Sequence, residues 1–181
     1  MTKQPNKHYL AIPKSGKGPG VLALHAWWGL NDFFKSFCDR LAAEGFVVLA
    51  PDLFQGKVAK TIDEADQLSS AMPMEKVEVF LTQAADDLSQ HPSVNCSGLG
   101  VVGFSYGAVW AVWLSQAKAH LFRAVTVFYG TGADDFSSSK SAYQGHFAEN
   151  DPFEPLENVT ELEGLLKAAN RTVDFNVYPG T

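Results

Sequence analysis

The sequence predicts an α/β fold: a doubly wound, mostly parallel β-sheet with helices on both faces. Short apolar runs alternate with amphipathic stretches along the chain, and this repeated order is typical of parallel strands joined by right-handed crossovers. The apolar runs are continuous rather than alternating with polar residues, as expected for strands buried on both faces. The 181 residues, 46% of them hydrophobic, suit a single domain that spans residues 1–181.

The first predicted strand is the apolar run at residues 20–26. Asn31 and Asp32 can cap the helix that follows, because their side chains accept hydrogen bonds from free N–H groups in the first turn. Gly45 ends this helix, and the next buried strand covers residues 46–50.

The stretch from residue 61 to 90 is predicted to be helical in two pieces. Thr61 followed by Glu64 forms a capping-box pattern at its start, and Pro73 divides it. The alternation then continues to the end, with predicted strands at 99–102, 124–129, 143–148 and 173–177 and predicted helices at 108–119 and 156–168.

Composition and charge exclude several classes of protein. The net charge of −6 argues against nucleic acid as a partner, because nucleic-acid-binding surfaces are basic. The sequence has no apolar run of about 18 residues, so no membrane-spanning helix is expected. The start is polar, unlike a secretory signal. Cys38 and Cys96 form no metal-type spacing and are expected to be reduced thiols in a cytoplasmic protein.

Residues 103–107 read G-F-S-Y-G, which matches the pattern G-x-S-x-G. A predicted buried strand precedes this match and a predicted helix follows it, which is the setting of a nucleophile elbow. In such a turn the hydroxyl of Ser105 projects from the sheet edge, and Gly103 and Gly107 avoid side-chain collisions. The alternative is a glycine-rich turn with a capping serine; the context favours Ser105 as a nucleophile.

A serine nucleophile also requires two N–H donors for the negative oxygen that forms during attack. One is expected from the backbone of Tyr106, the residue after the nucleophile. The other is expected from the loop after the first predicted strand, where Trp27 is the candidate. His25 lies just before this loop and precedes the nucleophile in sequence, so we expect it to position the loop rather than to act as the base.

The acid that orients the base is expected after the nucleophile, with the base histidine last. Asp151 is the leading candidate, since it follows a predicted strand in a polar turn that Pro152 stops. The alternatives are Asp134, Asp135 and Glu149. No histidine follows Asp151, and none of the five present fits the base; they are His8, His25, His91, His120 and His146.

Four motifs of this chain resemble those of the dienelactone hydrolase family, small esterases and lactonases with an α/β-hydrolase-type fold. They are L-H-A-W-W-G-L-N at 24–31, V-V-L-A-P-D-L-F-Q-G at 47–56, G-V-V-G-F-S-Y-G at 100–107 and H-F-A-E-N-D-P-F at 146–153. In addition, Y-P-G-T at 178–181 resembles the start of the family's histidine motif, in which Gly-His comes next. The resemblance extends over essentially the whole chain.

The resemblance implies a serine hydrolase that acts through an acyl-enzyme, without cofactor or metal. It places Ser105 as nucleophile, Asp151 as acid, Trp27 and Tyr106 as oxyanion donors, and the histidine just beyond Thr181. It also implies that the last helix of the fold is missing from these 181 residues. Truncation of the gene or its product is the first explanation, and a natural short form is the second.

Three departures from the family pattern bear on the substrate and the activity. The best-known members use a cysteine nucleophile and a glutamate in the first oxyanion loop, where this chain has Ser105 and Ala26. Those members hold a substrate carboxylate with arginines, whereas no arginine occurs between Asp52 and Phe122. We therefore expect a small neutral ester or lactone as substrate. Because the histidine is absent, the alternative is a catalytically incomplete protein of the same fold that binds its ligand without turnover. The sequence predicts no oligomeric state.

Overall fold

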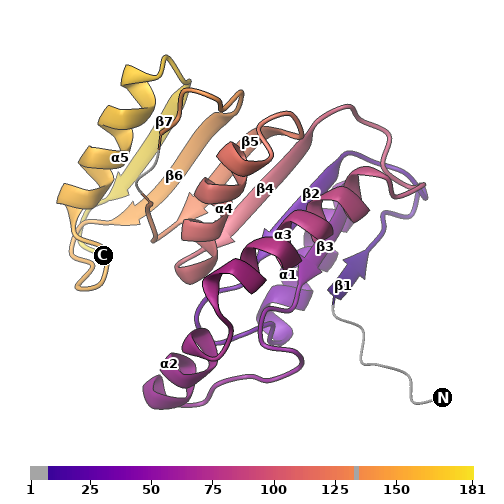
Figure 1. The fold of residues 1–181 in the computed structure, drawn as a ribbon, viewed down its shortest axis with the longest axis horizontal. Coiled ribbons are helices and arrows are strands. Elements are labelled where there is room, and N and C mark those ends of the chain that lie inside the picture. The colour runs from indigo at the N-terminus through magenta and orange to yellow at the C-terminus, as the bar shows by residue number, and fades with distance from the viewer. Residues whose placement is uncertain (1–7, 133–134) are drawn as a thin grey trace.

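The computed structural model describes residues 8–132 and 135–181 as a layered α/β structure (Figure 1). Within these ranges, seven strands form one sheet in the order β1-β3-β2-β4-β5-β6-β7. The strands are β1 (His8–Ala11), β2 (Gly20–Leu24), β3 (Val47–Pro51), β4 (Leu99–Phe104), β5 (Phe122–Phe128), β6 (Ala142–Ala148) and β7 (Val173–Tyr178). The helices are α1 (Asp32–Ala43), α2 (Ile62–Ser70), α3 (Met74–Ser89), α4 (Tyr106–Ala117) and α5 (Leu156–Ala168). The predicted α/β class, the mostly parallel sheet and the helices on both faces are confirmed.

Strand β1 is the one strand that the sequence did not predict. It pairs antiparallel with β3, with Leu10 opposite Leu49, whereas β2 to β7 pair in parallel. A four-residue segment is too short to show a periodic pattern, and its strand conformation depends on hydrogen bonds to a partner about forty residues away.

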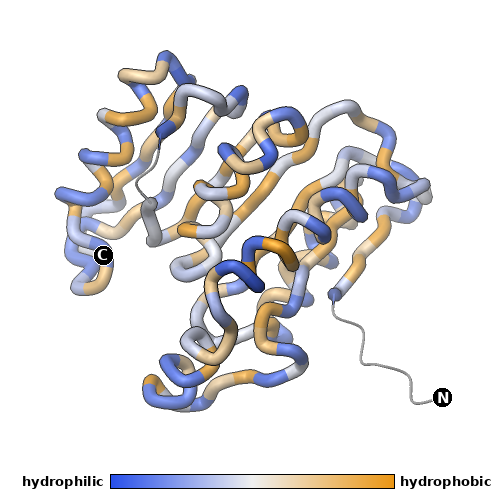
Figure 2. The backbone as a smooth tube through the Cα atoms, viewed as in Figure 1, coloured by the Kyte–Doolittle hydropathy of each residue, from blue (hydrophilic) through white to orange (hydrophobic). Residues whose placement is uncertain are grey.

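Two hydrophobic layers hold the helices against the sheet. Helices α3, α4 and α5 pack on one face, and α1 packs on the other against β1 and β3. In Figure 2 much of the tube along the central strands is orange, the colour of hydrophobic residues, as expected for a sheet covered on both sides. The larger core lies under α3, α4 and α5, and the smaller one under α1 centres on Phe34, Cys38 and Phe104.

Local signals in the sequence determine where the helices begin. The side chain of Asn31 accepts a hydrogen bond from the N–H of Phe34 at 3.3 Å and so caps α1. The hydroxyl of Thr61 accepts a hydrogen bond from the N–H of Glu64 at 3.2 Å and caps α2 in the predicted manner. Pro73 separates α2 from α3, as predicted.

On the α1 side, the sheet is open from β5 onward within the described ranges. Residues of β5 and β6 that point to this face, such as Ala124, Thr126, Gln144 and His146, are half-buried or exposed. Together with Phe37 and Leu41 of α1, this face lines a groove of about 540 Å³. A further helix covering this face remains a prediction.

The parallel strands all end at the same edge of the sheet, which positions the candidate site. The loops that follow β2, β4, β5 and β6 meet at this carboxyl edge, where α2 projects beyond the sheet (Figure 1). Ligand sites of open α/β sheets lie outside this edge. In the part of the chain that the structure describes, no helix is long and apolar enough to span a membrane.

Candidate functional site

Ser105 occupies a strained turn between β4 and α4. Its backbone has φ 50° and ψ −115°, a combination that L-residues rarely adopt. Its N–H donates a hydrogen bond to the carbonyl oxygen of Phe128 at 2.9 Å, which fixes the turn against the end of β5. The residue is half-buried at the carboxyl edge. A serine held in this conformation at the start of a helix has the geometry of a nucleophile elbow.

Glycines on either side make this turn possible because the backbone segments lie too close for a side chain. A Cβ atom at Gly103 would lie 2.2 Å from the carbonyl oxygen of Gly107. One at Gly107 would lie 2.4 Å from the carbonyl oxygen of Leu24. Gly130 plays the same part in the loop after β5, since its Cβ would come 2.7 Å from the carbonyl oxygen of Ser105. The two glycines of G-x-S-x-G are therefore required by packing.

The two residues expected to supply oxyanion donors both lie at this edge. Tyr106 is the first residue of α4, and Trp27 lies in the turn after β2, closed by a hydrogen bond from the N–H of Gly29 to the carbonyl oxygen of Ala26 at 3.0 Å. Within the described ranges, no protein atom accepts a hydrogen bond from the backbone N–H of Trp27 or of Tyr106. Both N–H groups are thus available to a ligand, and that of Tyr106 benefits from the positive end of the helix dipole.

His25 is a structural histidine in this arrangement. Its Nδ1 lies 2.8 Å from the carbonyl oxygen of Ala26, and its Nε2 lies 3.1 Å from the N–H of Leu53. A neutral ring that donates from Nδ1 and accepts at Nε2 satisfies both contacts. Burial lowers the pKa of His25 below its ordinary value, which also favours the neutral form. The ring holds the loop after β2 against the loop after β3, and neither nitrogen is left to act as a base.

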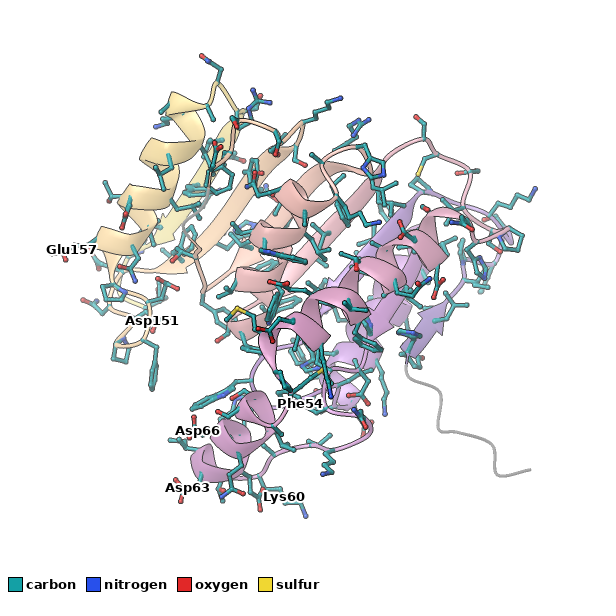
Figure 3. All side chains as sticks on the ribbon, in the orientation of Figure 1. Phe54, Lys60, Asp63, Asp66, Asp151 and Glu157 are labelled. Atoms are coloured by element: carbon teal, nitrogen blue, oxygen red, sulfur yellow. The ribbon has the colours of Figure 1, made fainter. Side chains whose placement is uncertain are left out.

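Asp151 lies in the turn after β6 with one side of its carboxylate engaged. Its Oδ1 accepts hydrogen bonds from the N–H groups of Phe153 at 2.8 Å and Glu154 at 3.2 Å. Among the described residues, nothing donates a hydrogen bond to Oδ2. The turn is therefore fixed by one oxygen while the other remains open to a partner. Figure 3 shows Asp151 beyond the end of β6, near α5.

The alternative acids are engaged elsewhere or lie outside the described ranges. Glu149 Oε2 accepts a hydrogen bond from the N–H of Gly180 at 2.9 Å. Asp135 bonds both the N–H and the hydroxyl of Ser137, which lowers the pKa of its carboxyl. Asp134 lies outside the described residues. Asp151 therefore remains the leading acid candidate.

The residues after β7 lie directly beside this acid. The N–H of Asn150 donates to the carbonyl oxygen of Thr181 at 2.8 Å, and the N–H of Glu149 donates to that of Tyr178 at 3.1 Å. These hydrogen bonds continue the pairing of β6 with β7 past the sheet edge. A residue bonded to Thr181 would thus start next to Asp151.

The other histidines do not meet Ser105 and Asp151. His91 and His120 precede β4 and β5, at the opposite edge of the sheet, and His8 lies in the edge strand β1, with β3 and β2 between it and β4. His146 lies within β6, where its Nδ1 is 2.7 Å from the hydroxyl of Tyr178 and its ring stacks on Phe128. In the described ranges, no group of three or more His, Cys, Asp or Glu side chains is placed to hold a metal ion.

Two contacts at this edge involve residues that the sequence did not single out. The indole N–H of Trp27 donates to the hydroxyl of Ser69 in α2 at 2.8 Å. The carboxylate of Glu154 accepts hydrogen bonds from the N–H of Thr131 at 2.8 Å and from its hydroxyl at 2.9 Å, which joins the loop after β5 to the Asp151 turn. No sequence signal indicates either contact, because each joins residues more than twenty positions apart.

Comparison with known proteins identifies the family. The family model described as "Dienelactone hydrolase family" matches residues 7–181. The chain belongs to the dienelactone hydrolase family. The resemblance found in the sequence motifs is thereby confirmed, and so is the α/β-hydrolase fold.

Several known proteins are similar over most of this chain. "Protein usf" of Aquifex pyrophilus is 38% identical over 95% of this chain and 78% of its own length. The "Putative carboxymethylenebutenolidase" of Aquifex aeolicus is 33% identical over 67% of this chain and 55% of its own length. Among solved structures, a dienelactone hydrolase-like promiscuous phosphotriesterase from metagenomic libraries has a TM-score of 0.78 at 24% identity, covering 93% of this chain and 72% of that one. The chain thus spans between about half and four fifths of the length of these relatives.

Proposed function

We propose that this protein is a serine hydrolase that cleaves small carboxylic esters or lactones through an acyl-enzyme. The observation that carries the proposal is the strained backbone of Ser105, held at the start of α4 between glycines that admit no side chain. Strain of this kind costs about 1–3 kcal/mol and persists where function requires it. Membership of the dienelactone hydrolase family supports the same chemistry.

In the proposed reaction, the hydroxyl oxygen of Ser105 attacks the carbonyl carbon of the ester while a base takes the hydroxyl proton. The negative charge that forms on the carbonyl oxygen is stabilised by the free backbone N–H groups of Trp27 and Tyr106. The base then gives its proton to the leaving alcohol oxygen, or to the ring oxygen of a lactone, as the C–O bond breaks. Water hydrolyses the acyl-enzyme by the same steps and regenerates the Ser105 hydroxyl.

We propose that the base is a histidine that follows Thr181 in the full-length protein. The free Oδ2 of Asp151 would accept its ring N–H and orient it toward Ser105. The hydrogen bond between Asn150 and Thr181 supports this assignment, because it brings the next residues beside the acid.

The surroundings of the site favour a neutral, apolar substrate. Exposed aromatic side chains lie in the loops at this edge, with Trp28 38% and Phe153 83% exposed. No arginine lies between Asp52 and Phe122, the segment that contains α2 and α3.

The two free thiols, Cys38 and Cys96, agree with the proposed cytoplasmic location.

The test is covalent labelling of the full-length protein with a fluorophosphonate, followed by peptide mapping. We expect a single labelled peptide that contains Ser105, loss of labelling in Ser105→Ala, and strongly reduced labelling in Asp151→Asn. Ser138→Ala is the matched control, because Ser138 is an exposed serine away from the elbow. Labelling that survives Ser105→Ala would overturn the proposal.

The sequence of the gene after the codon for Thr181 decides between this enzyme and its alternative. Gly-His followed by a helix-forming segment would complete the triad. A stop codon would leave the site without a base and favour a protein that binds its ligand without turnover, since the described histidines do not serve Ser105.

A further inference from the structure

We propose that Ser69 of α2 is a positioning residue for the oxyanion hole, which it serves by fixing the side chain of Trp27. The inference rests on the proposed function, in which the backbone N–H of Trp27 is an oxyanion donor.

The contact between the two residues is specific in direction. The indole N–H of Trp27 donates to the Ser69 hydroxyl oxygen at 2.8 Å, and that hydroxyl donates its own hydrogen to the carbonyl oxygen of Asp66 at 3.0 Å. An indole N–H can only donate, so the serine must be the acceptor. The hydrogen bond from Ser69 to Asp66 within α2 orients the serine hydroxyl so that its oxygen accepts the hydrogen bond from the indole N–H.

The remaining hydrogen bonds of the loop hold the neighbours of Trp27 rather than Trp27 itself, whose ring otherwise contacts that of Trp28 at a centroid distance of 6.4 Å. The N–H of Ala59 donates to the carbonyl oxygen of Trp28 at 3.0 Å, and His25 bonds the carbonyl oxygen of Ala26 at 2.8 Å. The backbone N–H of Trp27 has no protein acceptor within the described ranges. The indole bond to Ser69 is therefore the hydrogen bond by which the protein fixes this residue.

The weak packing of α2 explains why this link affects the site more than the fold. Ala65 is the buried residue of α2, and Leu68 packs against the main core only in part. The helix projects past the sheet edge, and Figure 3 shows Asp63 and Asp66 on it beyond Phe54. Few apolar contacts hold α2 in place, so its position relative to the loop depends on polar links such as this one.

The expected effect is on the catalytic step. Displacing a reacting group by about 1 Å costs on the order of 100-fold in rate, and removal of one oxyanion donor costs about 100- to 1,000-fold. Ser69→Ala loosens the donor without removing it, so we expect kcat to fall about 10-fold with KM changed less than twofold. Ser69→Thr keeps the hydroxyl and should restore kcat. If Ser69 had a merely structural role, Ser69→Ala would not lower kcat while leaving KM nearly unchanged.

The experiment measures ester hydrolysis by the full-length protein with Ser70→Ala as the matched control, since Ser70 is the exposed neighbour on the same helix. A double-mutant cycle with Trp27→Phe, which removes the indole N–H and keeps the backbone, tests the link directly. In the double variant Ser69→Ala with Trp27→Phe, we expect the fold-reduction in kcat to be smaller than the product of the two separate fold-reductions. Independent effects, or equal activity of Ser69→Ala and Ser70→Ala, would overturn the inference. Activity that survives Ser105→Ala would instead overturn the proposed function, so the two failures are distinguishable.

Discussion

Replacing the strained serine by glycine should stabilise the protein while abolishing its proposed chemistry. Ser105 has φ 50° and ψ −115°, and its Cβ is the cause of the strain. The strain is worth about 1–3 kcal/mol. Glycine removes it but loses more conformational entropy on folding, at a cost of about 0.5–1 kcal/mol. The net expectation for Ser105→Gly is a gain in the free energy of unfolding of about 0–2.5 kcal/mol, and of about 1 kcal/mol at the middle of both ranges.

Thermal unfolding measures this gain with Ser105→Ala as the control. Alanine also removes the hydroxyl but keeps the Cβ, so its stability should stay close to that of the parent protein. For a chain of 181 residues, 1 kcal/mol shifts the melting temperature by about 2–4 °C. Ser105→Gly should therefore melt about 2–4 °C above Ser105→Ala at the middle value, and up to about 10 °C above it at the upper end. A glycine variant that melts at or below the alanine variant would refute the assignment of strain to this turn.

Three further predictions follow from the packing and the buried groups. Gly107→Ala should destabilise the fold by about 3 kcal/mol or prevent folding, because its Cβ would lie 2.4 Å from the carbonyl oxygen of Leu24. Gly100→Ala is the control and should destabilise the fold only slightly, because the atom nearest to its Cβ would be 3.6 Å away. Equal loss of stability in the two variants, measured by urea unfolding, would contradict this. Burial lowers the pKa of His25 below its ordinary value of 6.5, so the unfolded chain binds a proton that the folded one does not, and stability should fall by up to about 1.4 kcal/mol per pH unit as pH drops below 6.5. His25→Gln should remove that part of the pH dependence measured by denaturant unfolding. Burial raises the pKa of Cys38 to about 12, so native Cys38 should resist iodoacetamide at pH 8 and react in urea, as peptide mass mapping would show.

The sequence predicts features that depend on neighbouring residues and misses those that depend on distant ones. Helix α5 spans residues 156–168 as predicted, because helical periodicity is local. The G-x-S-x-G match correctly placed Ser105 between a buried strand and a helix. Strand β1 was missed because it forms only against β3.

The candidate site shows the same limit. The sequence order indicated Ser105 and Asp151, and the motif indicated Tyr106. It could not show that Glu149 is engaged by Gly180, because that contact depends on how the loops after β6 and β7 meet. Nor could it show the bond from Trp27 to Ser69, which spans 42 positions in the chain. Contacts of this kind follow from the arrangement of the strands and are visible only in the folded chain.

The central claim is that Ser105 forms a covalent acyl-enzyme. The direct measurement is rapid-quench mass spectrometry of the full-length protein after mixing with p-nitrophenyl acetate. The account predicts a transient mass increase of one acetyl group, located on the peptide that contains Ser105 and absent in Ser105→Ala. Turnover without any acyl-enzyme on that peptide, or an acetyl group that persists in Ser105→Ala at the same rate, would contradict it.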